Sequence, residues 1–258
     1  YAQHKGYFYV GRGSGANSIV AYCLRITDVD PIDLDLYFER FINPYRTSPP
    51  DFDLDFSWKD RDDITDYIFR RHGREHVALL ATYSTFQFKA IIRELGKVFG
   101  LPKAEIDSLI DNRRHPDTPD QISRLIRLYA TRIIDFPSHL SIHAGGVLIS
   151  EKPVTWYTAT NMPPKGYPTT QFSMLESEDI GLYKCDILSQ RGLGHIKEAV
   201  EIIKRNRGID IDIHNIAAFK RDEKIKELIR NGRCMGCFYV ESPAMRMLLK
   251  KLRVDTYI

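Results

Sequence analysis

The sequence has few cysteines and no long apolar run, and each lack excludes a class of protein. Four cysteines scattered through 258 residues are too few for the disulfide framework of a small secreted fold, which favours a reducing, cytoplasmic environment. Cys234 and Cys237 form a CxxC pair, but no second such pair exists to complete a tetrahedral zinc site. No apolar stretch approaches the length that spans a membrane, so no membrane partner is expected.

A strong charge of one sign is also lacking. The net charge of +3 comes from 37 Lys and Arg against 34 Asp and Glu, so nucleic-acid binding would depend on where the charges are placed. With 43% hydrophobic residues, the chain can bury an ordinary core. It begins with Tyr1 and not with Met or a targeting segment, which indicates a piece of a longer protein.

A glycine-rich turn near the start of the chain is the first feature with chemical meaning. Residues 7–10 favour a strand, residues 11–15 form the turn, and a helix capped by Asn17 or Ser18 follows. A glycine loop that opens a helix presents backbone N–H groups and the positive end of the helix dipole. It can seat a triphosphate, although the loop alone is a weak signal.

The most informative segment alternates acidic and apolar residues from Asp51 to Phe56. As a strand it would place Asp51, Asp53 and Asp55 on one face and the apolar side chains in the core. Carboxylates about 5 to 7 Å apart repel by about 2 to 3 kcal/mol at an effective dielectric near 20, so cations should neutralise them. Oxygen ligands at this spacing favour magnesium. A solvated acidic edge strand is the alternative.

A further carboxylate lies in a later strand. Within residues 181–188, Lys184 and Asp186 interrupt an otherwise apolar run, where an unpaired charge would be costly to bury. Asp186 could complete a cage of carboxylates for two magnesium ions, which would activate a hydroxyl and stabilise a leaving pyrophosphate. Simple exposure of both residues at a strand end is the alternative.

The rest of the pattern is mostly helical. Helices are expected over residues 61–72, 86–99, 103–110, 119–136, 196–205, 222–231 and 243–252, the last capped by Ser242. Strands are expected at 77–82, from Leu140 through 147–149, and at 169–172. In the helix over 86–99, Lys89, Arg93 and Lys97 recur every four residues along one face. This cationic ridge is either solvated or used to bind a phosphate backbone.

Several short strings carry a resemblance to a known family. They are GRGSGANS at 11–18, PDFDLDF at 50–56, HAGG at 143–146 and KCD at 184–186, with FERF at 38–41 and CFYVES at 237–242. In this order, and over the whole chain, they resemble the alpha (catalytic) subunits of bacterial DNA polymerase III, the C-family replicative polymerases. Cys185 departs from that family's pattern, which has a bulky aromatic residue at this position, and the change should affect packing behind the strand and not the carboxylate.

The resemblance implies an α+β fold. It would be a DNA polymerase beta-like nucleotidyltransferase palm with a mixed sheet and helices, carrying a helical thumb insertion and the helical start of the fingers. The implied boundaries are 1–82 and 143–191 for the two parts of the palm, 83–142 for the thumb and 192–258 for the start of the fingers. The family's upstream phosphoesterase-like domain and most of its fingers are missing, so we expect the isolated fragment to be inactive.

The resemblance also assigns roles to individual residues. Asp51, Asp53 and Asp186 would be the catalytic carboxylates and would hold two Mg²⁺ ions, with Asp55 supporting them. The incoming nucleotide would be bound by Arg12, Gly13, Ser14, Arg40 and Lys184, and the DNA by Lys89, Arg93 and Lys97. His143 would be structural.

The implied function is template-directed DNA synthesis in chromosomal replication. A primer 3′-hydroxyl would attack the α-phosphate of a dNTP and pyrophosphate would leave. The implied partners are primer–template DNA, a dNTP and, through regions absent from this chain, the sliding clamp and other replisome subunits. The alternatives are the error-prone branch of the family, a nucleotidyltransferase acting on another substrate, and a non-catalytic nucleic-acid-binding relative.

Overall fold

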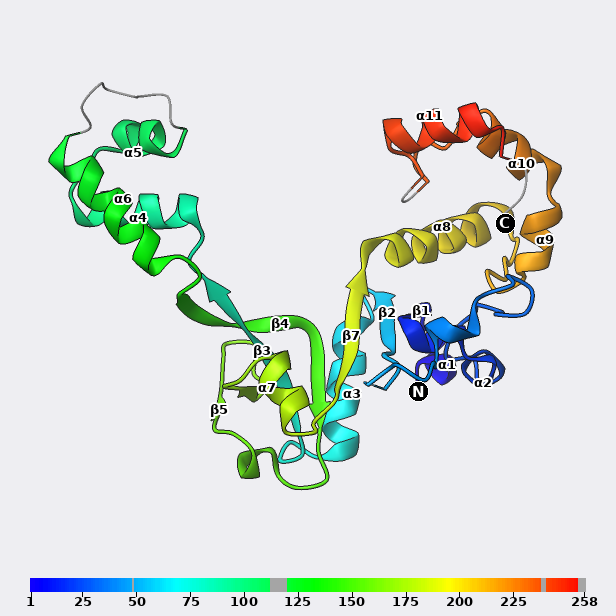
Figure 1. Ribbon diagram of the computed structural model, residues 1–258. Coiled ribbons are helices and arrows are strands. Elements are labelled where there is room, and N and C mark those ends of the chain that lie inside the picture. Colours follow the sequence, from blue (N-terminus) through cyan, green and yellow to red (C-terminus); the bar gives the residue numbers. More distant parts are fainter. Residues whose placement is uncertain (48, 112–119, 238–239, 255–258) are drawn as a thin grey trace. The chain divides into compact units, whose positions relative to one another are not determined.

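The computed structural model describes residues 1–47, 49–111, 120–237 and 240–254 (Figure 1). These residues form an α+β structure of helices and mixed β-sheet. The chain divides into a first compact unit, Tyr1–Arg74 with Cys185–Ile258, and a second one, Glu75–Lys184. Within the described ranges, no helix has the length and apolar character needed to cross a bilayer.

In the first unit, β2 (Asp53–Ser57) is paired on one side with a strand from the start of the chain and on the other with a strand from much later in the sequence. β1 (Tyr9–Arg12) runs antiparallel to β2, and β2 runs parallel to β7 (Lys184–Gln190). Parallel neighbours need a long crossover connection. Here that connection contains α3 (Arg61–His72) and the whole second unit.

Helices make up most of the rest of the first unit. Besides α3 they are α1 (Ala2–Lys5), η1 (Ser14–Asn17), α2 (Ile19–Cys23), η2 (Phe38–Arg40), α8 (Arg191–Arg207), α9 (Ile216–Arg221), α10 (Glu223–Arg230) and α11 (Pro243–Leu252). The bounds of α3 and α11 are those predicted from the sequence. Ser242 caps α11 as predicted, and Ser18 caps α2, which decides between the two predicted candidates Asn17 and Ser18. Their side chains accept the N–H groups of Met245 and Ala21.

The second unit combines a sheet with a group of helices. β3 (Val77–Thr85) pairs antiparallel with β4 (Pro137–Ile149) and parallel with β6 (Thr169–Thr170), and β6 pairs antiparallel with β5 (Thr160–Asn161). The first five residues of β3 are buried and form part of the core. The other elements are α4 (Phe88–Val98), α5 (Lys103–Ile110), α6 (Gln121–Ile133), η3 (Val154–Trp156) and α7 (Met174–Asp179).

The chain between β3 and β4 forms a helical lobe, which we define as α4, α5 and α6. Ile91, Ile92, Ile126 and Ala130 form its buried core. The bounds of α5 agree with the prediction, and α4 and α6 are shorter than predicted. The predicted start of α6 at Pro119 lies outside the described residues, as do residues 238–239 of the CFYVES string.

Several strand predictions are wrong in their extent. β1 covers Tyr9–Arg12 and not residues 7–10, so Gly11 and Arg12, predicted to lie in the glycine-rich turn, belong to the strand. β3 continues to Thr85, past the predicted end at 82, and β6 ends at Thr170, before the predicted end at 172.

β4 begins three residues before Leu140, where the β pattern was predicted to start, because residues from Pro137 onward pair with β3. β2 begins at Asp53 and not at Asp51, because the backbone around Asp51 bonds to the glycine-rich loop instead of a strand. Phe52, predicted to enter the core, is 38% exposed, whereas Phe56 is buried as predicted.

Truncating the core of the helical lobe should destabilise it. Ile126→Ala should cost about 2 to 4 kcal/mol, because Ile126 is 0% exposed and its loss leaves a cavity. Leu128→Ala is the matched control, since Leu128 lies on the same helix but is 48% exposed, and its cost should stay near 0.5 kcal/mol. Urea unfolding followed by circular dichroism measures both, and equal losses would contradict this core.

Candidate active site

The strands of the first unit place a cation and two carboxylates in one row. Arg12 on β1 is the register partner of Asp53 on β2, and Asp53 is the register partner of Asp186 on β7. Register partners direct their side chains to the same face of a sheet. Asp55, two residues further along β2, shares that face. The structure thus brings Asp186 beside Asp53 although the two are far apart in the sequence.

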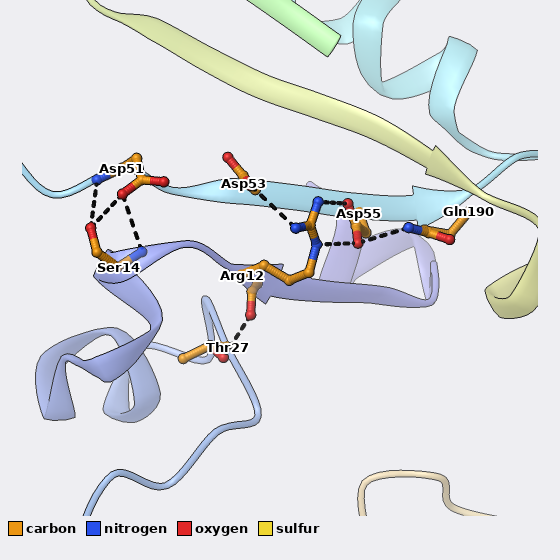
Figure 2. Close-up of polar contacts among 8 residues, drawn as sticks. Arg12, Ser14, Thr27, Asp51, Asp53, Asp55 and Gln190 are labelled. Carbon is orange, nitrogen blue, oxygen red and sulfur yellow. Dashed lines mark hydrogen bonds and ion pairs between the residues drawn. The ribbon is translucent and has the colours of Figure 1, made fainter. Parts of the chain in front are cut away.

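Arg12 holds the acids of this face together (Figure 2). Its Nε and Nη2 atoms donate to Oδ2 and Oδ1 of Asp55 at 2.6 and 3.0 Å, and its Nη1 atom lies 3.4 Å from Oδ2 of Asp53. Nε2 of Gln190 donates to Oδ2 of Asp55 at 3.2 Å. The hydrogen bonds to Asp55 raise the pKa of Arg12, and the charges of Asp55, Asp53 and Asp186 add to the rise.

Asp51 is held by the glycine-rich loop (Figure 2). Both the N–H group of Ser14, at 3.2 Å, and the Ser14 hydroxyl donate to Oδ1 of Asp51, and the N–H group of Asp51 donates to Oγ of Ser14 at 3.2 Å. Nη2 of Arg46 lies 3.4 Å from the same Oδ1 atom. The hydrogen bond from the Ser14 side chain is the largest cause of the lowered pKa of Asp51, against a smaller opposing effect of burial.

Two glycines let the loop approach Asp51 and Phe52 closely. Gly13 has φ 86°, and a Cβ atom on it would lie 2.5 Å from the carbonyl oxygen of Asp51. A Cβ atom on Gly15 would lie 2.4 Å from the ring of Phe52. The N–H groups of Ser14 and Gly15, expected to face a triphosphate, donate to Asp51 in this structure, the second to its carbonyl at 2.9 Å.

Arg40 and Lys184, the other candidate nucleotide-binding residues, and His143, predicted to be structural, lie in three separate elements. Arg40 ends η2 with an exposed side chain, and its carbonyl oxygen accepts from Nη1 of Arg46 at 3.3 Å. Lys184 begins β7, and strand alternation puts it on the same face of that strand as Asp186. His143 lies in β4, where its Nδ1 atom accepts the N–H group of Gly146 at 2.8 Å.

The cationic ridge is exposed, and it belongs to the second unit. Lys89, Arg93 and Lys97 lie along α4 with their side chains in solvent. Nζ of Lys97 also donates to Oε1 of Glu94 at 2.8 Å, so one of the three charges is partly neutralised on its own helix. The ridge therefore offers cations at regular spacing on an accessible helix face.

Sequence reasoning missed Arg46 and Gln190. Arg46 reaches Asp51 and also donates to the Pro49 carbonyl at 3.1 Å, which ties the segment before β2 to the site. Gln190 could have been found, because a residue four positions after Asp186 in the same strand lies on the same face. No comparable local signal points to Arg46.

The carboxylates suit a hard divalent cation in their chemistry, because all of their donors are oxygen atoms. Asp53 and Asp186 already lie side by side. In the part of the chain that the structure describes, however, no three acidic, histidine or cysteine side chains converge closely enough to hold an ion. Asp51 is bonded to Ser14 and Arg46, and Asp55 to Arg12. In this arrangement Arg12 neutralises charge on Asp53 and Asp55, and Arg46 neutralises charge on Asp51.

Known proteins similar to this chain belong to one group of polymerases. A model of the bacterial DNA polymerase III alpha NTPase domain matches residues 1–189, and a model of the alpha subunit finger domain matches residues 192–257. The DNA polymerase III subunit alpha of Bacillus subtilis is 39% identical over 94% of this chain and 23% of its own length. The error-prone DNA polymerase of Symbiobacterium thermophilum is 36% identical over 100% of this chain and 25% of its own length. The chain spans about a quarter of the length of these curated relatives.

Removing the Ser14 hydroxyl should raise the pKa of Asp51, because its hydrogen bond is the main cause of the lowering. A carboxyl group whose pKa is lowered by folding stabilises the folded state at pH values above its ordinary pKa of 3.8. This stabilisation is lost as the pH falls through the lowered pKa of the folded state. Ser14→Ala should therefore be less stable than the parent near neutral pH, and the difference should shrink in acid.

Titration of the Asp51 carboxyl carbon by NMR, on protein with ¹³C-labelled aspartate, measures this pKa directly. Ser14→Thr is the control, since it keeps a hydroxyl group and should keep the lowered value. An Asp51 pKa that does not rise in Ser14→Ala would show that the hydroxyl does not stabilise the carboxylate.

Proposed function

Because the chain belongs to the family of bacterial DNA polymerase III alpha subunits, we propose that it forms the nucleotidyl-transfer centre of template-directed DNA synthesis. The substrates are primer–template DNA and a dNTP, and the primer 3′-hydroxyl displaces pyrophosphate from the α-phosphate. The observation that carries this proposal is the row across β1, β2 and β7, which sets Asp53 beside Asp186 and next to the glycine-rich loop. No side-chain nucleophile is needed.

The parts of the fold receive polymerase roles in this proposal. Residues 1–82 and 143–191 form a palm of the DNA polymerase beta-like nucleotidyltransferase type, residues 83–142 a thumb, and residues 192–258 the start of the fingers. Support comes from the mixed sheet, the helical lobe between β3 and β4, and the finger-domain match over residues 192–257. The two compact units group residues 75–82 and 143–184 with the thumb, because β3 and β4 form one continuous ribbon that leads into the helical lobe.

Asp51, Asp53 and Asp186 are the residues that would hold Mg²⁺, as two ions. Bound Mg²⁺ supplies a lowered pKa of the primer hydroxyl and neutralises charge on the leaving pyrophosphate. The chain itself prepares the acids for this role. The register of β2 and β7 fixes Asp53 and Asp186, whereas Ser14 and Arg46 hold Asp51 at the start of β2.

The triphosphate is assigned to Arg12, Gly13, Ser14, Arg40 and Lys184. The N–H groups of the glycine-rich loop now donate to Asp51, and phosphate oxygens would accept them in its place when the nucleotide binds. Such an exchange would release Asp51 from the loop at the moment when its oxygens are needed. Binding of the nucleotide and completion of the acidic site are then one event.

The replicative branch is the assignment we favour, on the strings GRGSGANS and PDFDLDF. The error-prone branch is the alternative, and relatives of both names resemble the chain at 36 to 39% identity. In either branch the reaction at the acidic row is the same. The sliding clamp and other replisome subunits would contact parts of the full-length protein outside these residues.

Loss of either register-paired carboxylate should abolish synthesis. Asp53→Asn and Asp186→Asn in the full-length protein should each slow primer extension at least about 100-fold, because each loses charge that stabilises the transition state. Asp62→Asn is the control, since its carboxylate is 83% exposed on α3 and its rate should stay near the parent value. Single-turnover extension of a labelled primer measures all three. Parent-like rates for Asp53→Asn or Asp186→Asn would refute the proposed function.

The cationic ridge should bind duplex phosphates. Lys89→Ala and Arg93→Ala should each weaken primer–template binding and make the plot of log affinity against log salt shallower by about 0.9, the value for one lost phosphate contact. Lys103→Ala on α5 is the control, because its side chain is 90% exposed but lies outside the ridge. Fluorescence anisotropy over a range of salt concentrations gives the slopes. Slopes unchanged from the parent would show that the ridge is solvated and does not contact DNA phosphates.

A further inference from the structure

Asp55 is an acid at the site that the proposed reaction leaves without a defined task. It is 3% exposed, and it lies on the same face of β2 as Asp53. Burying a carboxylate is unfavourable unless it is paired and hydrogen-bonded. Arg12 from β1 and Gln190 from β7 both donate to Asp55, so it is bonded from the two strands that flank β2.

The guanidinium group of Arg12 is divided between two acids (Figure 2). Asp55 accepts from Nε and Nη2, and this bidentate pair fixes both the position and the plane of the group. Only Nη1 is directed at Asp53, at the longer distance of 3.4 Å. The location of Arg12 relative to Asp53 is therefore set by its bonds to Asp55.

Asp55 is the most buried of the three side chains in this chain of contacts. The side chain of Arg12 is 47% exposed, that of Asp53 is 19% exposed and that of Asp55 is 5% exposed. The buried Asp55 is also bonded to Gln190, whereas the Arg12 side chain between the two acids is the most exposed of the three. An arginine without this buried partner could turn to Asp53 and bind both of its oxygen atoms.

We propose that Asp55 is a positioning residue for Arg12. It occupies two of the guanidinium N–H groups, which keeps Arg12 beside Asp53 and limits the approach of Arg12 to that carboxylate to its Nη1 atom. The inference rests on the proposed function, since it takes Asp53 as catalytic and Arg12 as a nucleotide contact. A positioning role differs from a purely structural one, because Asp55 can then affect nucleotide binding only through the guanidinium group of Arg12.

Asp55→Asn in the full-length protein tests the proposal. Asparagine has the same shape, but its NH₂ group faces the donors of Arg12 and cannot accept from them. On a dideoxy-terminated primer–template, where no chemistry occurs, the dissociation constant for the next dNTP should rise about 10-fold or more, since bonds to a charged group are lost. The KM for dNTP in primer extension should rise by the same factor. An unchanged dissociation constant would overturn the proposal.

A double-mutant cycle shows whether the effect passes through Arg12. Arg12→Lys keeps the charge but has no fork, so in that background Asp55→Asn should leave the dissociation constant nearly unchanged. An equal rise in both backgrounds would overturn the proposal. Gln190→Ala, which removes a single hydrogen bond to Asp55, should raise the dissociation constant for dNTP by a smaller factor of about 2 to 5. It serves as the test if Asp55→Asn does not fold.

Asp60→Asn is the matched control. Asp60 is also a buried acid, 7% exposed, and its two oxygen atoms accept from Nζ of Lys197 at 2.9 Å each. This variant should lose stability without weakening dNTP binding, and a rise equal to that of Asp55→Asn would overturn the proposal. The Asp53→Asn and Asp186→Asn variants separate this inference from the proposed function. If they abolish extension while Asp55→Asn binds dNTP normally, only the positioning role fails.

Discussion

The ion pair between Arg12 and Asp55 allows three carboxylates to share one face of a small sheet. Unit charges about 5 Å apart repel by roughly 3 kcal/mol at an effective dielectric of about 20, and burial makes such charges costlier still. Asp55 and Asp186 are both buried, and Asp53 lies between them on the sheet face. A single guanidinium group, bonded to Asp55 and close to Asp53, offsets this repulsion. The central position of β2 depends on that neutralisation.

The site has a fixed half and an adjustable half. Asp53 and Asp186 lie within paired strands, so the ladder between β2 and β7 sets their separation. Asp51 lies before β2, where its carboxylate is 55% exposed and is bonded to Ser14 and Arg46. Exposed hydrogen bonds exchange readily for bonds to a ligand, because water and ligand compete for the same groups. The strand pair can thus define the position of the reaction while the loop responds to the substrate.

The insertion of the second unit is a consequence of parallel pairing. β2 and β7 can lie side by side only if a long connection returns the chain to the same end of the sheet. In this chain that connection carries β3, β4 and the helical lobe, whose exposed ridge of Lys89, Arg93 and Lys97 is suited to a polyanion. The same crossover that joins the acids therefore supplies the candidate DNA-binding element.

The sequence by itself determined the local features and the family. Helical spacing and capping residues gave the bounds of α3, α5 and α11 and the caps Ser18 and Ser242, because these signals lie within one element. The resemblance already grouped Asp53 with Asp186. Only the tertiary structure decided the register that sets them opposite each other, the start of β2 after Asp51, and the contacts of Arg46 and Gln190. Periodicity tells which face of its own strand a residue occupies. It does not tell which strand lies alongside, or in what register, because those follow from long-range packing and charge pairing.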